Sequence, residues 1–204
     1  MLKKISITLL GMLIIYTGAS FAMKASIGIC PVDAAIASFA ALTGMKIGSF
    51  SMLFHGSFFL GQIVLERRAF KKTEFLQIPY IILGGYIMNF FLYTVLANVE
   101  FNSYLLRFVV CLLSFVVCSL GCILVMDAHL MRIPVEGFVQ ILADRTGITL
   151  GKMKQRSDFL LILCCVAVTL IFGIAWTLRE GTILSAIVFG PLMDFWRRVL
   201  RLNK

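Results

Sequence analysis

One short segment occurs twice in the chain, and no other feature limits the fold as strongly. Pro31-Val32-Asp33 opens it and Thr43-Gly44 closes it, and Pro134-Val135-Glu136 and Thr146-Gly147 do the same 103 positions later. The same register aligns five further identical pairs: Gly18 with Gly121, Met23 with Met126, Ala25 with Ala128, Ala40 with Ala143, and Gly48 with Gly151. The sequence therefore predicts two copies of one structural unit, residues 1–103 and 104–204.

The composition indicates that this unit folds in a membrane. Of the 204 residues, 60% are hydrophobic and only 14% are charged, which excludes an ordinary soluble globule. The apolar runs lack the alternation of barrel strands, so we expect helices in a lipid bilayer. The net charge of +9 would suggest nucleic acid in a soluble protein. Here the basic residues lie between apolar runs, where they orient the chain in the membrane, and we expect no nucleic-acid partner.

Each copy contains three apolar stretches that we predict to span the membrane as helices. They cover about 5–25, 48–65 and 75–99 in the first copy, and about 105–126, 158–178 and 182–196 in the second. The first stretch resembles a secretory signal. Residues 18–30 are nevertheless matched by residues 121–133, which cannot be a signal, so we expect the first helix to be retained.

The duplicated segments, 31–43 and 134–146, are too short to span the membrane. Helices of this length measure about 20 Å, against a hydrocarbon core of about 30 Å. The first is apolar nearly all round, and we expect it to dip into the membrane. The second carries Glu136, Gln140 and Asp144 on one face. It either rests at the cytoplasmic interface or lines a water-filled vestibule.

The basic residues predict the orientation of the chain. With the N-terminus inside, fifteen of the nineteen lysines and arginines fall in segments on the inner side, as in cytoplasmic loops. Both termini are then cytoplasmic. Because each copy has three spans, the second copy is upside down relative to the first. We therefore expect an all-α transmembrane fold with an inverted 3+3 repeat, an architecture that recurs in transporters.

Asp33 and Glu136 are the first candidate site residues. A carboxylate in or near the membrane is costly to keep charged, and it marks a site for a cation, an amine or a proton. Helices also commonly begin with a proline and an acid two residues later. The acid accepts hydrogen bonds from free N–H groups and interacts favourably with the positive end of the helix dipole. The two roles are compatible, since a helix N-terminus itself binds anions.

Asn89 and Asp194 complete the predicted substrate-binding site. Each follows a glycine by four positions in the third apolar helix of its copy. Polar groups at such places rarely face lipid, so they line a site or bond to a neighbouring helix. Both explanations stay open from the sequence.

Two other polar residues lie in the stretch 48–65. Gln62 either lines a cavity or bonds between helices. His55 lies opposite Asp158 in the repeat register, which allows a proton relay. A single histidine on an apolar helix is more often a packing residue.

No pattern in the chain indicates an enzyme. There is no nucleophile elbow, P-loop or HExxH motif. The six cysteines show no metal-binding spacing, and we expect them to pack as small apolar residues. We therefore expect no catalytic residues, no cofactor and no metal site.

At these residues the chain resembles the YitT/YczE/YyaS-type family of small bacterial membrane proteins. The resemblance rests on Ala25 through Pro31-Val32-Asp33, Ala128 through Pro134-Val135-Glu136, the two Thr-Gly turns, and Gly181-Thr182 leading to Gly190-Pro191. The chain departs from the family pattern around the second proline, where Met131-Arg132-Ile133 precede it and Glu136 follows. The resemblance implies a multi-pass protein of the bacterial inner membrane and carries no biochemical function.

These features lead to one functional hypothesis and two alternatives. We expect a transporter or permease of a small polar solute, with its site between Asp33, Glu136, Asn89 and Asp194. The first alternative is an accessory protein that binds a membrane-protein partner, or a second copy of itself, through glycine-rich faces or basic loops. The second is the substrate-binding subunit of a vitamin uptake complex, which is also built from short helices.

Overall fold

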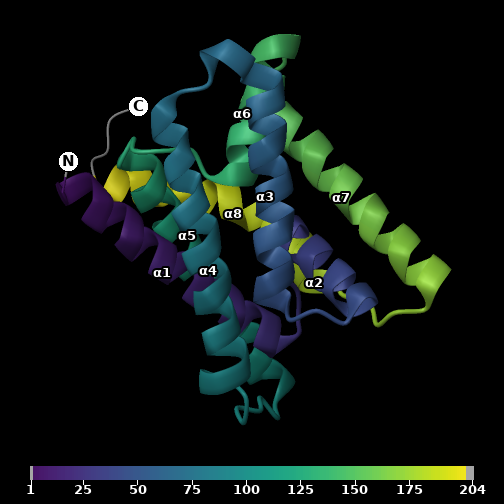
Figure 1. The fold of residues 1–204 in the computed structure, drawn as a ribbon. Coiled ribbons are helices and arrows are strands. Elements are labelled where there is room, and N and C mark those ends of the chain that lie inside the picture. The colour runs from purple at the N-terminus through teal and green to yellow at the C-terminus, as the bar shows by residue number, and fades with distance from the viewer. Residues whose placement is uncertain (1, 201–204) are drawn as a thin grey trace.

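The computed structural model describes residues 2–200, and within this range the chain is helical, without strands. Its eight α-helices are α1 (Leu2–Ala25), α2 (Pro31–Thr43), α3 (Ile47–Glu66), α4 (Gln77–Phe90), α5 (Tyr104–Asp127), α6 (Pro134–Thr146), α7 (Leu150–Phe172) and α8 (Glu180–Val199). Two 3-10 segments, Arg67–Ala69 and Lys72–Leu76, connect α3 to α4, and a π-helical turn, Phe91–Val95, extends α4. The predicted all-helical fold is confirmed (Figure 1).

Five helical segments of the described chain are long and apolar enough to cross a membrane. They are Leu2–Ala25, Ile47–Ala69, Lys72–Val95, Tyr104–Asp127 and Gly151–Phe172. The sixth predicted span, 182–196, lies in α8, which is not among the five. Pro191 and Asp194 interrupt the apolar run of α8, and Arg197 ends it. The chain is therefore a helical protein of the membrane type.

α7 differs from the fifth predicted span, 158–178. It begins at Leu150, so the basic residues from Lys152 to Arg156 belong to the helix. It ends at Phe172 because Gly173 adopts a left-handed conformation with a φ of 65°, which terminates a helix. Hydropathy alone does not detect the start of α7, because the helix begins in a charged stretch.

α1 and α5 form a closely packed antiparallel pair. A Cβ atom on Gly11 would lie 2.8 Å from the carbonyl oxygen of Gly121, and one on Gly18 would lie 2.6 Å from Sγ of Cys118. Residue numbers rise along α1 as they fall along α5, so the two helices run in opposite directions. Glycine at these contacts allows the two backbones to approach each other.

The two short helices lie along α3 and run toward its opposite ends (Figure 1). α2 leads directly into the start of α3, and its N-terminal half packs against Phe54. Near the N-terminus of α6, Phe138 packs edge-on against Phe58, with 5.2 Å between ring centroids. At its C-terminus, Arg145 donates a hydrogen bond to the carbonyl of Leu65, at the end of α3. Both short helices therefore begin about halfway along α3.

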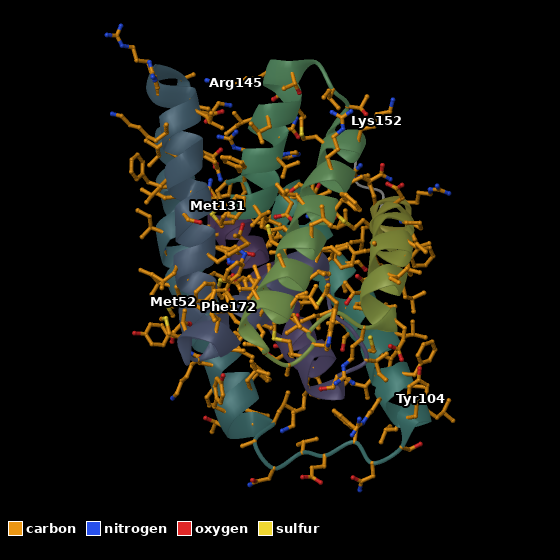
Figure 2. The ribbon with its side chains drawn as sticks, turned by 90° about the vertical axis from the view of Figure 1, so that its right-hand side faces the viewer. Met52, Tyr104, Met131, Arg145, Lys152 and Phe172 are labelled. Atoms are coloured by element: carbon orange, nitrogen blue, oxygen red, sulfur yellow. The ribbon has the colours of Figure 1, made fainter. Side chains whose placement is uncertain are left out.

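The two ends of the bundle differ in charge. The start of α1, the turn from α3 to α4 and the turn from α6 to α7 lie toward the upper end in Figure 1, and the loop from α4 to α5 lies at the lower end. Arg145 and Lys152 lie at the upper end in Figure 2, opposite Tyr104. We call the upper end the basic end. It also carries Lys3, Lys4, Arg67, Arg68, Lys71 and Lys72.

Candidate functional site

Asp33 lies in the first turn of α2, which begins at Pro31. Its Oδ2 atom accepts a hydrogen bond from the thiol of Cys30 at 3.0 Å, and its side chain is half-buried. The carboxylate lies within electrostatic range of His55, Glu136 and Lys154. The structure therefore brings Asp33 and Glu136 into one neighbourhood.

Glu136 occupies the matching position in the first turn of α6 and has a cationic partner. Nζ of Lys154, on α7, lies 3.6 Å from Oε1 of Glu136 and 2.9 Å from Oδ1 of Asp158. Lys154 and Asp158 are one helical turn apart, a spacing at which side chains on a helix meet. Lys154 thus holds together a carboxylate of α6 and a carboxylate of α7.

Apolar packing fixes where the two short helices begin. Val32 and Ile36 of α2 pack in one buried cluster with Val135 and Val139 of α6. These four residues occupy equivalent positions in the two helices, one position before and three positions after Asp33 and Glu136. The N-termini of α2 and α6 are therefore held near each other inside the bundle, and their positive dipole ends stabilise the two carboxylates.

His55 is buried on α3 near Asp33. Its Nδ1 atom lies 2.9 Å from the carbonyl oxygen of Ser51 and 3.2 Å from the Ser51 hydroxyl, both in the same helix. These contacts hold the ring in place and fit the packing role. The ring is nevertheless close enough to Asp33 to act on its charge.

The neighbourhood around the two short helices carries more acids than bases. Asp33, Glu136 and Asp158 bring three carboxylates, against the single ammonium of Lys154. Such a group attracts a cation or exchanges a proton. Within residues 2–200, no three His, Cys, Asp or Glu side chains are grouped so that they could hold a metal ion. The neighbourhood formed by Asp33, Glu136, Asp158 and Lys154 therefore contains more acidic than basic side chains.

A second polar network ties α3 and α4 to the segment before α6. The buried amides of Gln62 and Gln77 bond to each other reciprocally at 3.0 Å, and Gln62 also donates to the carbonyl of Pro134 at 2.7 Å. Gln77 donates to Glu74 at 2.8 Å, and Nε of Arg132 donates to Glu74 at 3.0 Å. These groups satisfy one another, so Gln62 ties helices together and does not offer a free amide.

Arg132 also bonds to Glu66, at the end of α3. Its hydrogen bonds to Glu66 raise the pKa of Arg132, and the charge of Glu74 adds to this effect. The guanidinium therefore stays cationic at any physiological pH.

The other two predicted site residues lie elsewhere. Oδ1 of Asn89 accepts a hydrogen bond from the N–H of Gly48 at 2.9 Å, and its Nδ2 donates to the Ser49 hydroxyl at 3.1 Å. Asn89 thus forms hydrogen bonds with a backbone N–H and a hydroxyl group in the first turn of α3. Asp194 is exposed on α8. In the part of the chain that the structure describes, no hydrogen bond or ion pair joins either residue to Asp33 or Glu136.

Lys154 and Arg132 are the residues that the sequence analysis missed. From the sequence, both belong only to the basic residues predicted to lie on the cytoplasmic side. Two signals could have identified Lys154: it precedes Asp158 by four positions, and Asp158 is the register partner of His55. Nothing local marks Arg132, because its acidic partners Glu66 and Glu74 lie far away in the sequence.

The comparisons with known proteins place the chain in a family without assigning it an activity. The model of a family of unknown function, DUF6198, matches residues 2–198. No curated protein matches the chain, and no solved structure does. The resemblance to the YitT/YczE/YyaS-type family is not tested by this match and stays a prediction. Since the matched region covers almost the whole sequence, the chain belongs to the DUF6198 family.

Proposed function

We propose that the protein is a membrane transporter or permease of a small polar solute, whose site lies where α2 and α6 begin. One observation carries this proposal: two short helices start about halfway along α3, with Asp33 and Glu136 in their first turns and in electrostatic range of each other. Short helices that meet inside a membrane bundle are a recurring way to build a transport site.

We further propose that the two copies form an inverted repeat. Three pairs of helices begin 103 positions apart, at Pro31 and Pro134, Ile47 and Leu150, and Gln77 and Glu180. Gly44 and Gly147 end the short helices with the same φ of 68° and ψ of 11°. These shared boundaries support one structural unit that is used twice.

The contacts of α1 with α5 support the inversion. Gly18 lies against Ser114, and Gly121 lies against Gly11. In the repeat register Gly18 corresponds to Gly121, and Gly11 corresponds to Ser114. The two contacts are therefore equivalent. An operation that exchanges the copies therefore exchanges these two helices. Because α1 and α5 are antiparallel, the same operation turns each of them end for end, as an inverted repeat requires.

The charges at the site favour a cationic solute or a coupled proton. The neighbourhood contains three carboxylates and one ammonium, so an additional positive charge would be electrostatically favourable there. Lys154 bridges Glu136 and Asp158, and an incoming cation can compete with it for the same oxygen atoms.

Uptake into proteoliposomes tests this proposal, with radiolabelled methylammonium as the first solute and a panel of neutral and cationic solutes after it. We expect Asp33→Asn and Glu136→Gln each to reduce uptake by about tenfold, which corresponds to the loss of a charge contact of about 1.4 kcal/mol. Asp194→Asn, on the exposed face of α8, serves as the matched control and keeps the uptake of the unsubstituted protein. Unchanged uptake in both site variants would contradict the site assignment.

The basic end supports our proposal that both termini are cytoplasmic, in a bacterial inner membrane. If no solute is transported and the protein co-purifies with another membrane protein, the accessory role replaces the transporter.

A further inference from the structure

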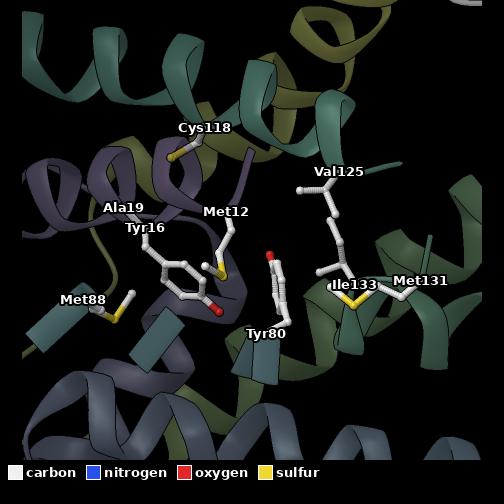
Figure 3. Close-up of a cluster of buried hydrophobic side chains, with 9 residues drawn as sticks. All are labelled: Met12, Tyr16, Ala19, Tyr80, Met88, Cys118, Val125, Met131 and Ile133. Carbon is white, nitrogen blue, oxygen red and sulfur yellow. The ribbon is translucent and has the colours of Figure 1, made fainter. Parts of the chain in front are cut away.

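An apolar groove opens between α1 and α4, toward the basic end of the bundle. It has a volume of about 190 Å³ and is lined mainly by Leu9, Met12, Pro79, Tyr80, Leu83 and Met131. Met12, Tyr80 and Met131 belong to a buried cluster (Figure 3), in which the rings of Tyr80 and Tyr16 lie 6.0 Å apart. Leu9 and Leu83 are more than 40% exposed. The groove therefore has a packed floor and open walls.

The chemistry of the groove suits hydrocarbon. Two lining residues carry hydroxyls: that of Thr8 donates to the carbonyl of Lys4 at 2.9 Å, and Tyr80 is buried in the floor of the groove. On α1 the groove extends from Ile5 to Met12, a length of about 10 Å at ~1.5 Å per residue. A helix from a partner, about 10–12 Å in diameter, does not fit into this volume. One section of a single extended alkyl chain does.

The groove ends near four exposed lysines. Lys4 precedes the lining residue Ile5, and Lys72 begins the 3-10 segment that ends at the lining residue Leu76. Lys3 and Lys71 lie next to them in the sequence, and all four lysines are exposed. None of the four forms an ion pair within residues 2–200, and the acid of this segment, Glu74, is engaged by Arg132. The mouth of the groove therefore carries four lysines, and Asp127, three positions before the lining residue Leu130, forms no ion pair with them in the described chain.

We propose that this groove binds one acyl chain of an anionic phospholipid, with the phosphate of its head group against Lys4 and Lys72. The apolar walls pack against the chain, and the lysines select for negative head-group charge. A lysine at the membrane surface gains most from an anionic lipid when no protein acid competes for it. This site is separate from Asp33 and Glu136 and does not depend on the transport proposal.

Native mass spectrometry of the full chain tests the lipid site. The probes are phosphatidylglycerol and phosphatidylcholine with identical acyl chains, titrated against the delipidated protein in detergent. We expect phosphatidylglycerol to bind about tenfold more tightly, and the pair Lys4→Gln with Lys72→Gln to remove this preference. The control pair Lys152→Gln with Arg156→Gln removes the same charge from exposed positions on α7 and leaves the preference in place.

A second set of variants tests the groove itself. Leu83→Trp fills the groove and is expected to lower the affinity for phosphatidylglycerol several-fold, whereas Leu60→Trp, at an exposed position of α3 outside the groove, does not. If a thermal scan shows that the Leu83→Trp variant is not folded, the Leu9→Trp variant is used in its place. Three results would overturn the proposal: equal binding of the two lipids, equal loss in both charge pairs, or full binding in the filled variants. A dimer that Leu83→Trp dissociates would overturn it as well.

Discussion

The guanidinium of Arg132 forms a two-pronged ion pair with the carboxylate of Glu66, with Nη2 2.6 Å from Oε2 and Nη1 2.9 Å from Oε1. This pair ties the end of α3 to the segment that leads into α6. In the repeat register the two positions correspond to Ile29 and Thr169, which carry no charge. The ion pair at the basic end joins the two copies, and the register partners Ile29 and Thr169 cannot form an equivalent pair.

Replacement of Arg132 by leucine is expected to destabilise the protein. The substitution leaves Glu66 and Glu74 without their cation, which costs about 2 kcal/mol or more for partly buried groups. The measurement is the unfolding temperature in detergent. Arg68→Leu is the control, because Arg68 is exposed and forms no ion pair in the described chain. Equal shifts in the two variants would show that Arg132 contributes only surface charge.

Addition of a methyl group at Gly11 is expected to separate α1 from α5. A Cβ atom there would lie 2.8 Å from the carbonyl oxygen of Gly121, so Gly11→Ala lowers the unfolding temperature. Gly56→Ala is the matched control, since a Cβ at Gly56 meets nothing within 4 Å. Alanine at this helical position stabilises the protein by up to about 1 kcal/mol. The prediction fails if both variants change in the same direction.

Asn89→Ala is expected to lower stability and to leave solute uptake per folded molecule unchanged. The amide satisfies the Gly48 N–H and the Ser49 hydroxyl at the start of α3, and loss of such a helix cap costs about 1 kcal/mol. Ser49→Ala removes only one of the two contacts and should have the smaller effect. A selective loss of uptake without a loss of stability would instead place Asn89 in the substrate site.

Cysteines at Thr43 and Thr146 are expected to react with a membrane-impermeant thiol reagent from opposite sides of the membrane. Both threonines are exposed at the C-terminal ends of the short helices, which run toward opposite ends of α3. The six native cysteines are replaced first, so that each variant carries one thiol. Reaction of both from the same side would rule out the inverted repeat.

The helices were readable from the sequence because the signals that define them are local. Pro31 and Pro134 begin the short helices, and Gly44 and Gly147 end them in left-handed conformations. Apolar runs of the length of a membrane core identify most of the long helices. α7 departs from its prediction because its first two turns are charged, and hydropathy does not detect a charged helix.

The sequence by itself determined the membrane environment, the helical class and the two carboxylates of the short helices, since each follows from composition or from neighbours along the chain. Only the tertiary structure decided which polar groups meet. Lys154 joins Glu136 to Asp158, Arg132 joins Glu66 to Glu74, and Asn89 caps α3. Except for Lys154 with Asp158, these partners lie far apart in the sequence. Their contacts follow from how the helices pack, which no local pattern in the sequence records.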